Sequence, residues 1–218
     1  ITRNNAMVKR LQVLAHNIFH YLFSKETNLI SLNDFPYIRI ISPGIMKFDG
    51  QKTYIATADV EGTKINYNAP LIAFEKRESR ANMQPIANSV WFAKMKNSIK
   101  HINVTKDDSN FIENYVFSTG FLGLKCKDIA FEYLINYLEL PYFENIKDLL
   151  SHGATQQSIN NEDLKLFKIH IPSKEQLEFF HNKTTLIYCC ISKISQINNK
   201  LINLKEKILP LLINGQLQ

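Results

Sequence analysis

The sequence is poor in cysteine, glycine and proline. Among 218 residues there are three Cys, seven Gly and seven Pro. Two of the cysteines, Cys189 and Cys190, are neighbours and the third is Cys126, so they cannot form a disulfide framework, and we expect a reducing, cytoplasmic compartment. The scarcity of Gly and Pro excludes a collagen-like or Pro/Gly-rich disordered chain. No apolar run approaches the roughly 18 residues that a membrane span needs, so no membrane partner is expected.

Catalytic signatures are also missing. There is no Gly-rich phosphate loop, no His-Glu-x-x-His, no Cys-x-x-Cys and no Gly-x-Ser-x-Gly. The Asn/Asp-Pro-Pro-Tyr/Phe run of DNA amino-methyltransferases has only an incomplete counterpart at Leu140–Phe143. His16 and His20 are one helical turn apart, but no further ligand is in range for a metal. The sequence therefore predicts a binding protein without metal or cofactor, and not an enzyme.

Two segments have the pattern of long helices. Residues 7–23 carry apolar residues three and four apart, and a second helix is predicted from Ser173, which forms a capping box with Gln176. In that helix apolar residues step by 3 and 4 in strict alternation, which is typical of a coiled-coil seam. The seam comprises Ile187, Cys190, Ile194, Ile197, Leu201, Leu204, Ile208 and Leu211. Pro210 and Gly215 are predicted to end the helix. The alternative is a helix that lies on its own globular core.

The segment between these helices has a different texture. Short apolar runs at 37–41, 54–57, 69–74 and 90–93 predict strands, and Gly44, Gly50 and Gly62 predict turns. Two helices are predicted at 127–137 and 143–151, and Trp91 and Phe92 are expected in the core. We therefore predict an α+β fold, in which a mixed, strand-rich globular domain is flanked by two long helices that pair as an antiparallel coiled coil.

Positive charge is concentrated in one part of the globular segment. The chain has 26 Lys and Arg against 20 Asp and Glu, and residues 76–106 hold seven basic residues and one acid. Asn and Gln side chains are interleaved among them. Lys and Arg can neutralise phosphates, and Arg, Asn and Gln can pair with base edges, so this mixture is compatible with a nucleic-acid surface as well as with an ordinary solvated face.

A string near the end of the globular segment is more specific. It runs through residues 153–160, 164–168, Ile169-His170-Ile171-Pro172 and Glu175-Gln176. The string resembles the end of the target recognition domain in specificity subunits of type I restriction-modification systems. Residues 204–217 resemble the end of that family's conserved spacer helix, and residues 54–60 and 118–121 resemble earlier parts of the domain. The resemblance covers residues 35–217.

The resemblance implies a non-catalytic subunit with two recognition domains, each reading half of a bipartite site in double-stranded DNA. It also implies docking to methyltransferase subunits and, with them, to a motor-nuclease subunit. Only one recognition domain is present here, at 27–172, between a spacer-helix end at 1–26 and a spacer helix at 173–218. Two explanations fit: a C-terminal half of a longer chain, which the start at Ile1 favours, or a natural half-subunit that forms a homodimer.

Candidate site residues follow from the charge and the resemblance together. Those expected to contact DNA are Lys76, Arg77, Arg80, Lys94, Lys96, Lys100, Thr155 and Gln157, with Arg77 and Arg80 as candidate base readers. Those expected in the helix pairing are Leu11, Ile18, Leu22, Ile194, Ile197, Leu201, Leu204 and Ile208. Two other functions stay open: the recognition part of a single-chain restriction-methylation enzyme, and a coiled-coil scaffold that does not bind DNA.

Overall fold

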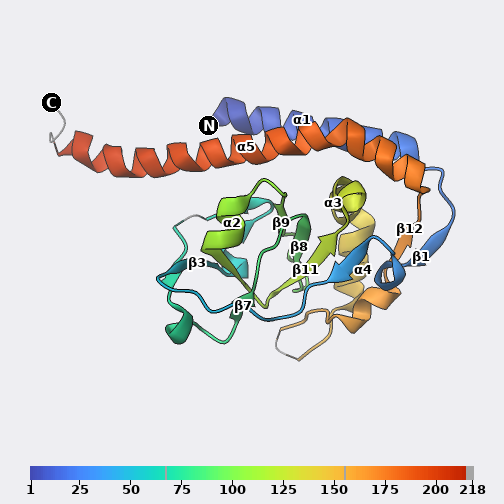
Figure 1. Ribbon diagram of the computed structural model, residues 1–218, viewed down its shortest axis with the longest axis horizontal. Helices are drawn as coiled ribbons and strands as arrows, with labels where there is room; N and C mark the ends of the chain where they lie inside the picture. Colours follow the sequence, from blue (N-terminus) through green and yellow to red (C-terminus); the bar gives the residue numbers. More distant parts are fainter. Residues whose placement is uncertain (67, 155, 215–218) are drawn as a thin grey trace.

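Two long helices lie side by side along one side of a globular unit that contains both helices and strands (Figure 1). The computed structural model describes residues 1–66, 68–154 and 156–214, with the side chain at 203 left aside. Helix α1 is Thr2–Phe23, which begins five residues before the predicted start, and α5 is Lys174–Ile213. The side chains of Asn4 and Asn198 are hydrogen-bonded at one end of the pair, and the rings of Phe23 and Phe180 meet at the other. The two helices are therefore antiparallel.

The globular unit contains short strands and three further α-helices. The helices are α2 (Ser109–Asn114), α3 (Phe131–Leu138) and α4 (Pro141–Leu150). The strands are β1 (Leu29–Ser31), β2 (Ile38–Ile40), β3 (Lys52–Ile55), β4 (Val60–Glu61), β5 (Lys64–Ile65), β6 (Leu71–Ile72), β7 (Ala81–Met83), β8 (Ser89–Ala93), β9 (His101–Val104), β10 (Tyr115–Ser118), β11 (Phe121–Cys126) and β12 (Lys168–His170). The predicted α+β class is confirmed.

The strands form two four-stranded sheets and two small ribbons. One sheet has the order β6-β3-β10-β7, in which β3 and β10 are parallel, and the other has the order β2-β11-β8-β9 and is antiparallel throughout. A short turn at Thr119 and Gly120 connects β10 of the first sheet to β11 of the second. The ribbon β1–β12 lies beside the C-terminal end of α1 and the N-terminal end of α5 (Figure 1).

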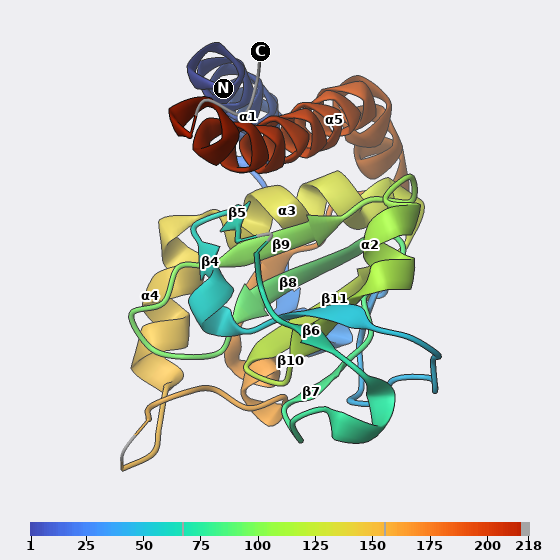
Figure 2. The same cartoon turned by 90° about the vertical axis from the view of Figure 1, so that its left-hand side faces the viewer.

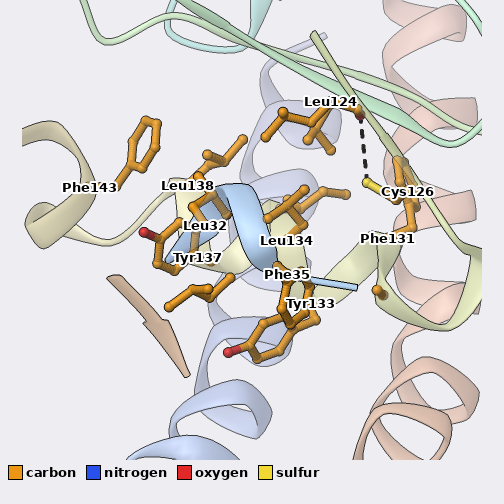
Figure 3. Packing of buried hydrophobic residues seen from close by; sticks show 14 of the residues in the cluster. Leu32, Phe35, Leu124, Cys126, Phe131, Tyr133, Leu134, Tyr137, Leu138 and Phe143 are labelled. Atoms are coloured by element: carbon orange, nitrogen blue, oxygen red, sulfur yellow. Dashed lines mark hydrogen bonds between the residues drawn. The ribbon is translucent and has the colours of Figure 1, made fainter. Parts of the chain in front are cut away.

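Strand β8 is buried on both faces and divides the core into two clusters. Val90 and Phe92 face the cluster that contains α3 and the two long helices, part of which is shown in Figure 3. Trp91 and Ala93 face the first sheet, β6-β3-β10-β7. The Trp91 ring lies against Gly123 of β11, where an added Cβ would come within 2.4 Å of the ring. Trp91 and Phe92 are fully buried, so their predicted place in the core is confirmed.

Helix α5 begins as predicted and ends later. The Ser173 hydroxyl accepts a hydrogen bond from the Gln176 backbone N–H, and the Gln176 side chain accepts one from the Ser173 N–H. The predicted stop at Pro210 is wrong, because the helix continues through Pro210 to Ile213. A proline removes one backbone donor and crowds the preceding turn, but it does not by itself unwind a helix of this length. Gly215 lies outside the described residues.

The first half of α5 lies on its own globular unit. Leu177, Phe180, Thr184 and Tyr188 are buried in the row that faces α1 and α3. Polar contacts from α5 continue this row: His181 and Thr185 bond the buried carboxylate of Glu132, and Ser192 and Gln196 donate to that of Asp108. The alternative of a helix packed on its own core is thus correct for this half.

The predicted seam is only partly covered by α1. In α1, Leu11, Ile18 and Leu22 are half-buried beside α5, and Ile194 and Ile208 in α5 are half-buried. Ile197, Leu201 and Leu204 are 50%, 40% and 52% exposed. Helix α1 of this chain leaves these three exposed: it starts at Thr2, level with Asn198, so Leu201 and Leu204 lie beyond its end. Their pairing with another helix stays a prediction. In the part of the chain that the structure describes, no helix is long and apolar enough to cross a membrane.

Candidate nucleic-acid interface

Four chain segments meet on the globular unit through backbone hydrogen bonds, and we call them the loop cluster: residues 77–80, 94–97, 118–120 and 156–159. The Lys94 N–H donates to the Gly120 carbonyl (3.0 Å), and the Lys96 N–H donates to the Gln157 carbonyl (3.0 Å). Figures 1 and 2 place the chain around 74–80 and 151–158 on the side of the globular unit that faces away from α1 and α5. The long helices therefore leave this side open to a large partner.

Lys96 and Gln157 belong to two loops that are locked together. Two further contacts join the loops in addition to the hydrogen bond between Lys96 and Gln157. Met95 pairs with Ser158 in an antiparallel bridge, and the Ile159 N–H donates to the Lys94 carbonyl (3.1 Å). The side chains of Lys96 and Gln157 are exposed. Lys96 and Gln157, 61 positions apart in sequence, thus lie on one surface. Thr155, the other candidate of this loop, lies outside the described residues.

Gly153 shapes the start of the second loop. Its φ of +124° is unfavourable for any residue with a side chain, and an added Cβ would lie 2.8 Å from the Gln156 carbonyl oxygen. The glycine of the Gly-x-Thr-Gln string therefore has a steric role in the turn. Gln156 itself is exposed.

Arg77 and Lys100 are already engaged within the chain. The Arg77 guanidinium donates to the Phe74 carbonyl (2.7 Å) and lies 4.0 Å above the centre of the Phe74 ring. The Lys100 ammonium donates to the Thr57 carbonyl (2.7 Å). Each group therefore uses one of its donors within the chain, and the position of its charge is fixed by that contact. Lys76 is exposed on the 3₁₀ turn Phe74–Lys76, close in sequence to Arg77 but outside the loop cluster.

Arg80 and Lys94 lie together at the turn between β10 and β11. The Thr119 N–H donates to the Arg80 carbonyl (2.8 Å), beside the bond from Lys94 to Gly120. Arg80 is exposed and Lys94 is half-buried. Partial burial, together with the positive charge of Arg80, lowers the pKa of Lys94.

A buried ionic cluster supports the 94–100 loop from behind, and sequence reasoning missed it. The Lys147 side chain in α4 is fully buried; its ammonium donates to the Ser98 carbonyl (2.7 Å) and pairs with Glu144 (2.5 Å). Glu144 also contacts His101 Nε2 at 3.1 Å. Burial raises the pKa of Glu144, but the hydrogen bonds from His101 and Lys147 outweigh it and hold the pKa below its usual value. Nothing in the local sequence around Lys147 distinguishes it from a surface lysine.

Asn97 occupies the tip of the same loop. Its φ is +55°, in the left-handed region where Asn is one of the few residues tolerated, and its N–H donates to the Asp148 carboxylate (2.9 Å). The Asn97-Ser98 pair was the available sequence signal for this turn. Together with Lys147, Asp148 fixes the loop that carries Lys96.

The described residues contain no group of three or more His, Cys, Asp or Glu side chains that could hold a metal ion. The rings of His16 and His20 are stacked edge to face, 4.7 Å between centres. The three cysteines are free, and Cys126 is buried in the core. The chemistry that the loop cluster offers is therefore hydrogen bonding and positive charge.

Comparison with known proteins places this arrangement in a known fold. No family model matches the chain, and no curated protein matches its sequence. One solved structure concerns the complex assembly and conformational transition of the type I R-M system. A chain in it is 18% identical to this one, with a TM-score of 0.52 over 84% of this chain and 49% of that chain. The S subunit of a type I restriction-modification system from M. genitalium is 14% identical, with a TM-score of 0.51 over 97% of this chain and 55% of that one.

The chain thus has the fold of a type I restriction-modification specificity subunit, and the resemblance noted in its sequence is confirmed at the level of the fold. It spans about half the length of each of these two chains.

Proposed function

We propose that the chain is a DNA-recognition unit of a type I restriction-modification complex, and that its single globular domain reads one half of a bipartite site. The observation that carries the proposal is the fold that 84% and 97% of this chain share with the two type I proteins. The basic loop cluster supports it, because Lys96, Arg80 and Lys94 lie on a side that the long helices leave free. In this assignment the chain has no catalytic role and depends on methyltransferase subunits for modification.

The exposed C-terminal end of α5 supports association of the chain with a second recognition half. Beyond Asn198 the helix has no partner from α1 within the described residues, and Leu201, Leu204, Leu209 and Leu211 are exposed in its last turns. Isolated apolar helix surface of this length favours association. We expect it to pair with the corresponding helix of another recognition half, either in a longer chain or in a second copy, within a complex that also holds methyltransferase and motor-nuclease subunits.

Selection of binding sites tests this proposal. The full chain, alone and with its methyltransferase subunit, is incubated with a library of random-sequence DNA duplexes, and the bound fraction is sequenced. We expect enrichment of a short motif, and affinity that decreases with salt as counterion release requires. Absence of both enrichment and salt dependence, in a sample that is folded and contains the methyltransferase subunit, would overturn the proposal and favour a scaffold role.

A further inference from the structure

The turn between β10 and β11 brings two cations to one place. Arg80 directly precedes β7, and Lys94 directly follows β8. The backbone of each is nevertheless hydrogen-bonded to this turn, Arg80 to Thr119 (2.8 Å) and Lys94 to Gly120 (3.0 Å). An added Cβ on Gly120 would lie 3.1 Å from the Arg80 guanidinium and 2.9 Å from the Thr57 methyl group. The guanidinium therefore lies directly over the glycine, on the same turn that binds Lys94.

Neither cation has an acidic partner among the described residues. Ion pairs there involve Lys47, Lys147 and Lys174, but not Arg80 or Lys94. Two like charges held together in a partly desolvated place repel each other, and the lowered pKa of Lys94 reflects this. A bound anion would remove the repulsion, whereas the uncharged edge of a base would not.

The neighbouring basic residues differ in this respect. Arg77 and Lys100 each donate to a backbone carbonyl of their own chain, so one donor of each side chain is used without a ligand. Arg80 and Lys94 have no such hydrogen bond in the part of the chain that the structure describes. The four basic residues, similar in sequence, thus fall into an engaged pair and an available pair.

We propose that Arg80 and Lys94 together hold a single backbone phosphate of the bound DNA. Arg80 is then an anchoring residue and not a base reader. Gly120 has no side chain, which leaves room for the Arg80 guanidinium over the turn beside Lys94. This inference rests on the proposed function, because it assumes that the ligand is duplex DNA.

The salt dependence of binding tests the inference. Binding of the full chain, with its methyltransferase subunit where required, to the duplex selected by the wild type is measured over a series of salt concentrations. The variants are Arg80→Gln, Lys94→Gln and the double substitution, and the matched controls are Lys9→Gln and Arg10→Gln, at two exposed basic residues of α1 outside the loop cluster. Thermal unfolding of every variant confirms that it is folded.

A shared phosphate predicts a non-additive result. Because the remaining cation still neutralises the shared phosphate, each single variant should reduce the magnitude of the slope of log K against log salt by less than about 0.9. The double variant should reduce it by about 0.9, the share of one phosphate, and not by the roughly 1.8 that two separate phosphates would give. Lys9→Gln and Arg10→Gln should leave the slope unchanged. Site selection with Arg80→Gln should return the wild-type motif at lower affinity.

The other outcomes separate the two proposals. A loss of slope of about 1.8 in the double variant, an unchanged slope in the double variant, or an altered motif with Arg80→Gln would overturn the shared phosphate while DNA recognition stands. If the wild-type complex shows neither motif nor salt dependence, the proposed function itself fails. A duplex with one neutral methylphosphonate at the contacted position gives an independent check: it should weaken the wild type but not the double variant.

Discussion

The two halves of α5 belong to one continuous helix and have opposite surroundings. From Leu177 to Tyr188 the helix is covered by α1 and α3, and its buried row includes aromatic side chains and hydrogen-bonded polar groups. From Leu201 to Ile213 its leucines and isoleucines are largely exposed. A continuous 3.5-residue repeat thus indicates where a helix can pair, but the length of the neighbouring helix decides where it does. The first half is part of the fold, and the second half is available to a partner.

The largest effect is expected in the covered half. Phe180 is fully buried, and its ring lies 5.4 Å from that of Phe23 and 6.0 Å from that of Phe19. Phe180→Ala removes these contacts and leaves a cavity, so the free energy of unfolding should decrease by about 3–5 kcal/mol. Chemical denaturation measures the change.

The next residue in sequence provides the control. Phe179 is half exposed and contacts Lys183 on the outer side of α5. Phe179→Ala should cost less than about 1 kcal/mol, since only a surface contact is lost. Similar losses for the two variants would show that the first half of α5 is not anchored in the core as described.

An intermediate effect is expected at the border between the halves. Asn198 is buried, accepts a hydrogen bond from the Asn4 side chain (2.8 Å) and donates to that of Asn5 (2.9 Å). Asn198→Ala should cost about 1–3 kcal/mol, because Asn4 and Asn5 lose partners in a partly dry interface. Asn199→Ala, one position on and less buried, should be close to neutral in the same denaturation experiment. If both were neutral, the three asparagines would not hold α1 and α5 in register.

The smallest effect on stability is expected in the exposed half. Leu204→Asp should change the free energy of unfolding of the isolated chain by about 0.5 kcal/mol or less, because Leu204 already faces solvent. The same change should weaken association with a second recognition half, measured by sedimentation, since it places a charge in an apolar contact.

Lys205→Asp is the matched control, because it alters charge on the same turn of an exposed face without removing apolar surface. It should leave association in place. Strong destabilisation by Leu204→Asp without loss of association would mean that the exposed half of α5 folds back onto its own chain.

Much of the architecture could be predicted from local patterns. The capping box at Ser173 and Gln176, the helix at 7–23, the buried strand with Trp91 and Phe92, and the glycine turns depend on residues close in sequence, and the structure agrees with each. Local patterns were less informative about extent: α1 begins earlier than its apolar stripe, and α5 continues through Pro210. Helix ends depend on what packs beside them, which a single window of sequence does not contain.

The candidate site divides in the same way. By itself, the sequence determined that a basic segment exists between residues 76 and 106 and that a specific string follows at 153–172, because composition and motifs are properties of the chain alone. Only the tertiary structure decided which of these side chains are available: it joined Lys96 to Gln157, engaged Arg77 with Phe74, buried Lys147 behind the loop and placed Arg80 beside Lys94. The physical reason is that a charged group is free or satisfied according to the atoms around it, and here those atoms come from strands and loops distant in sequence.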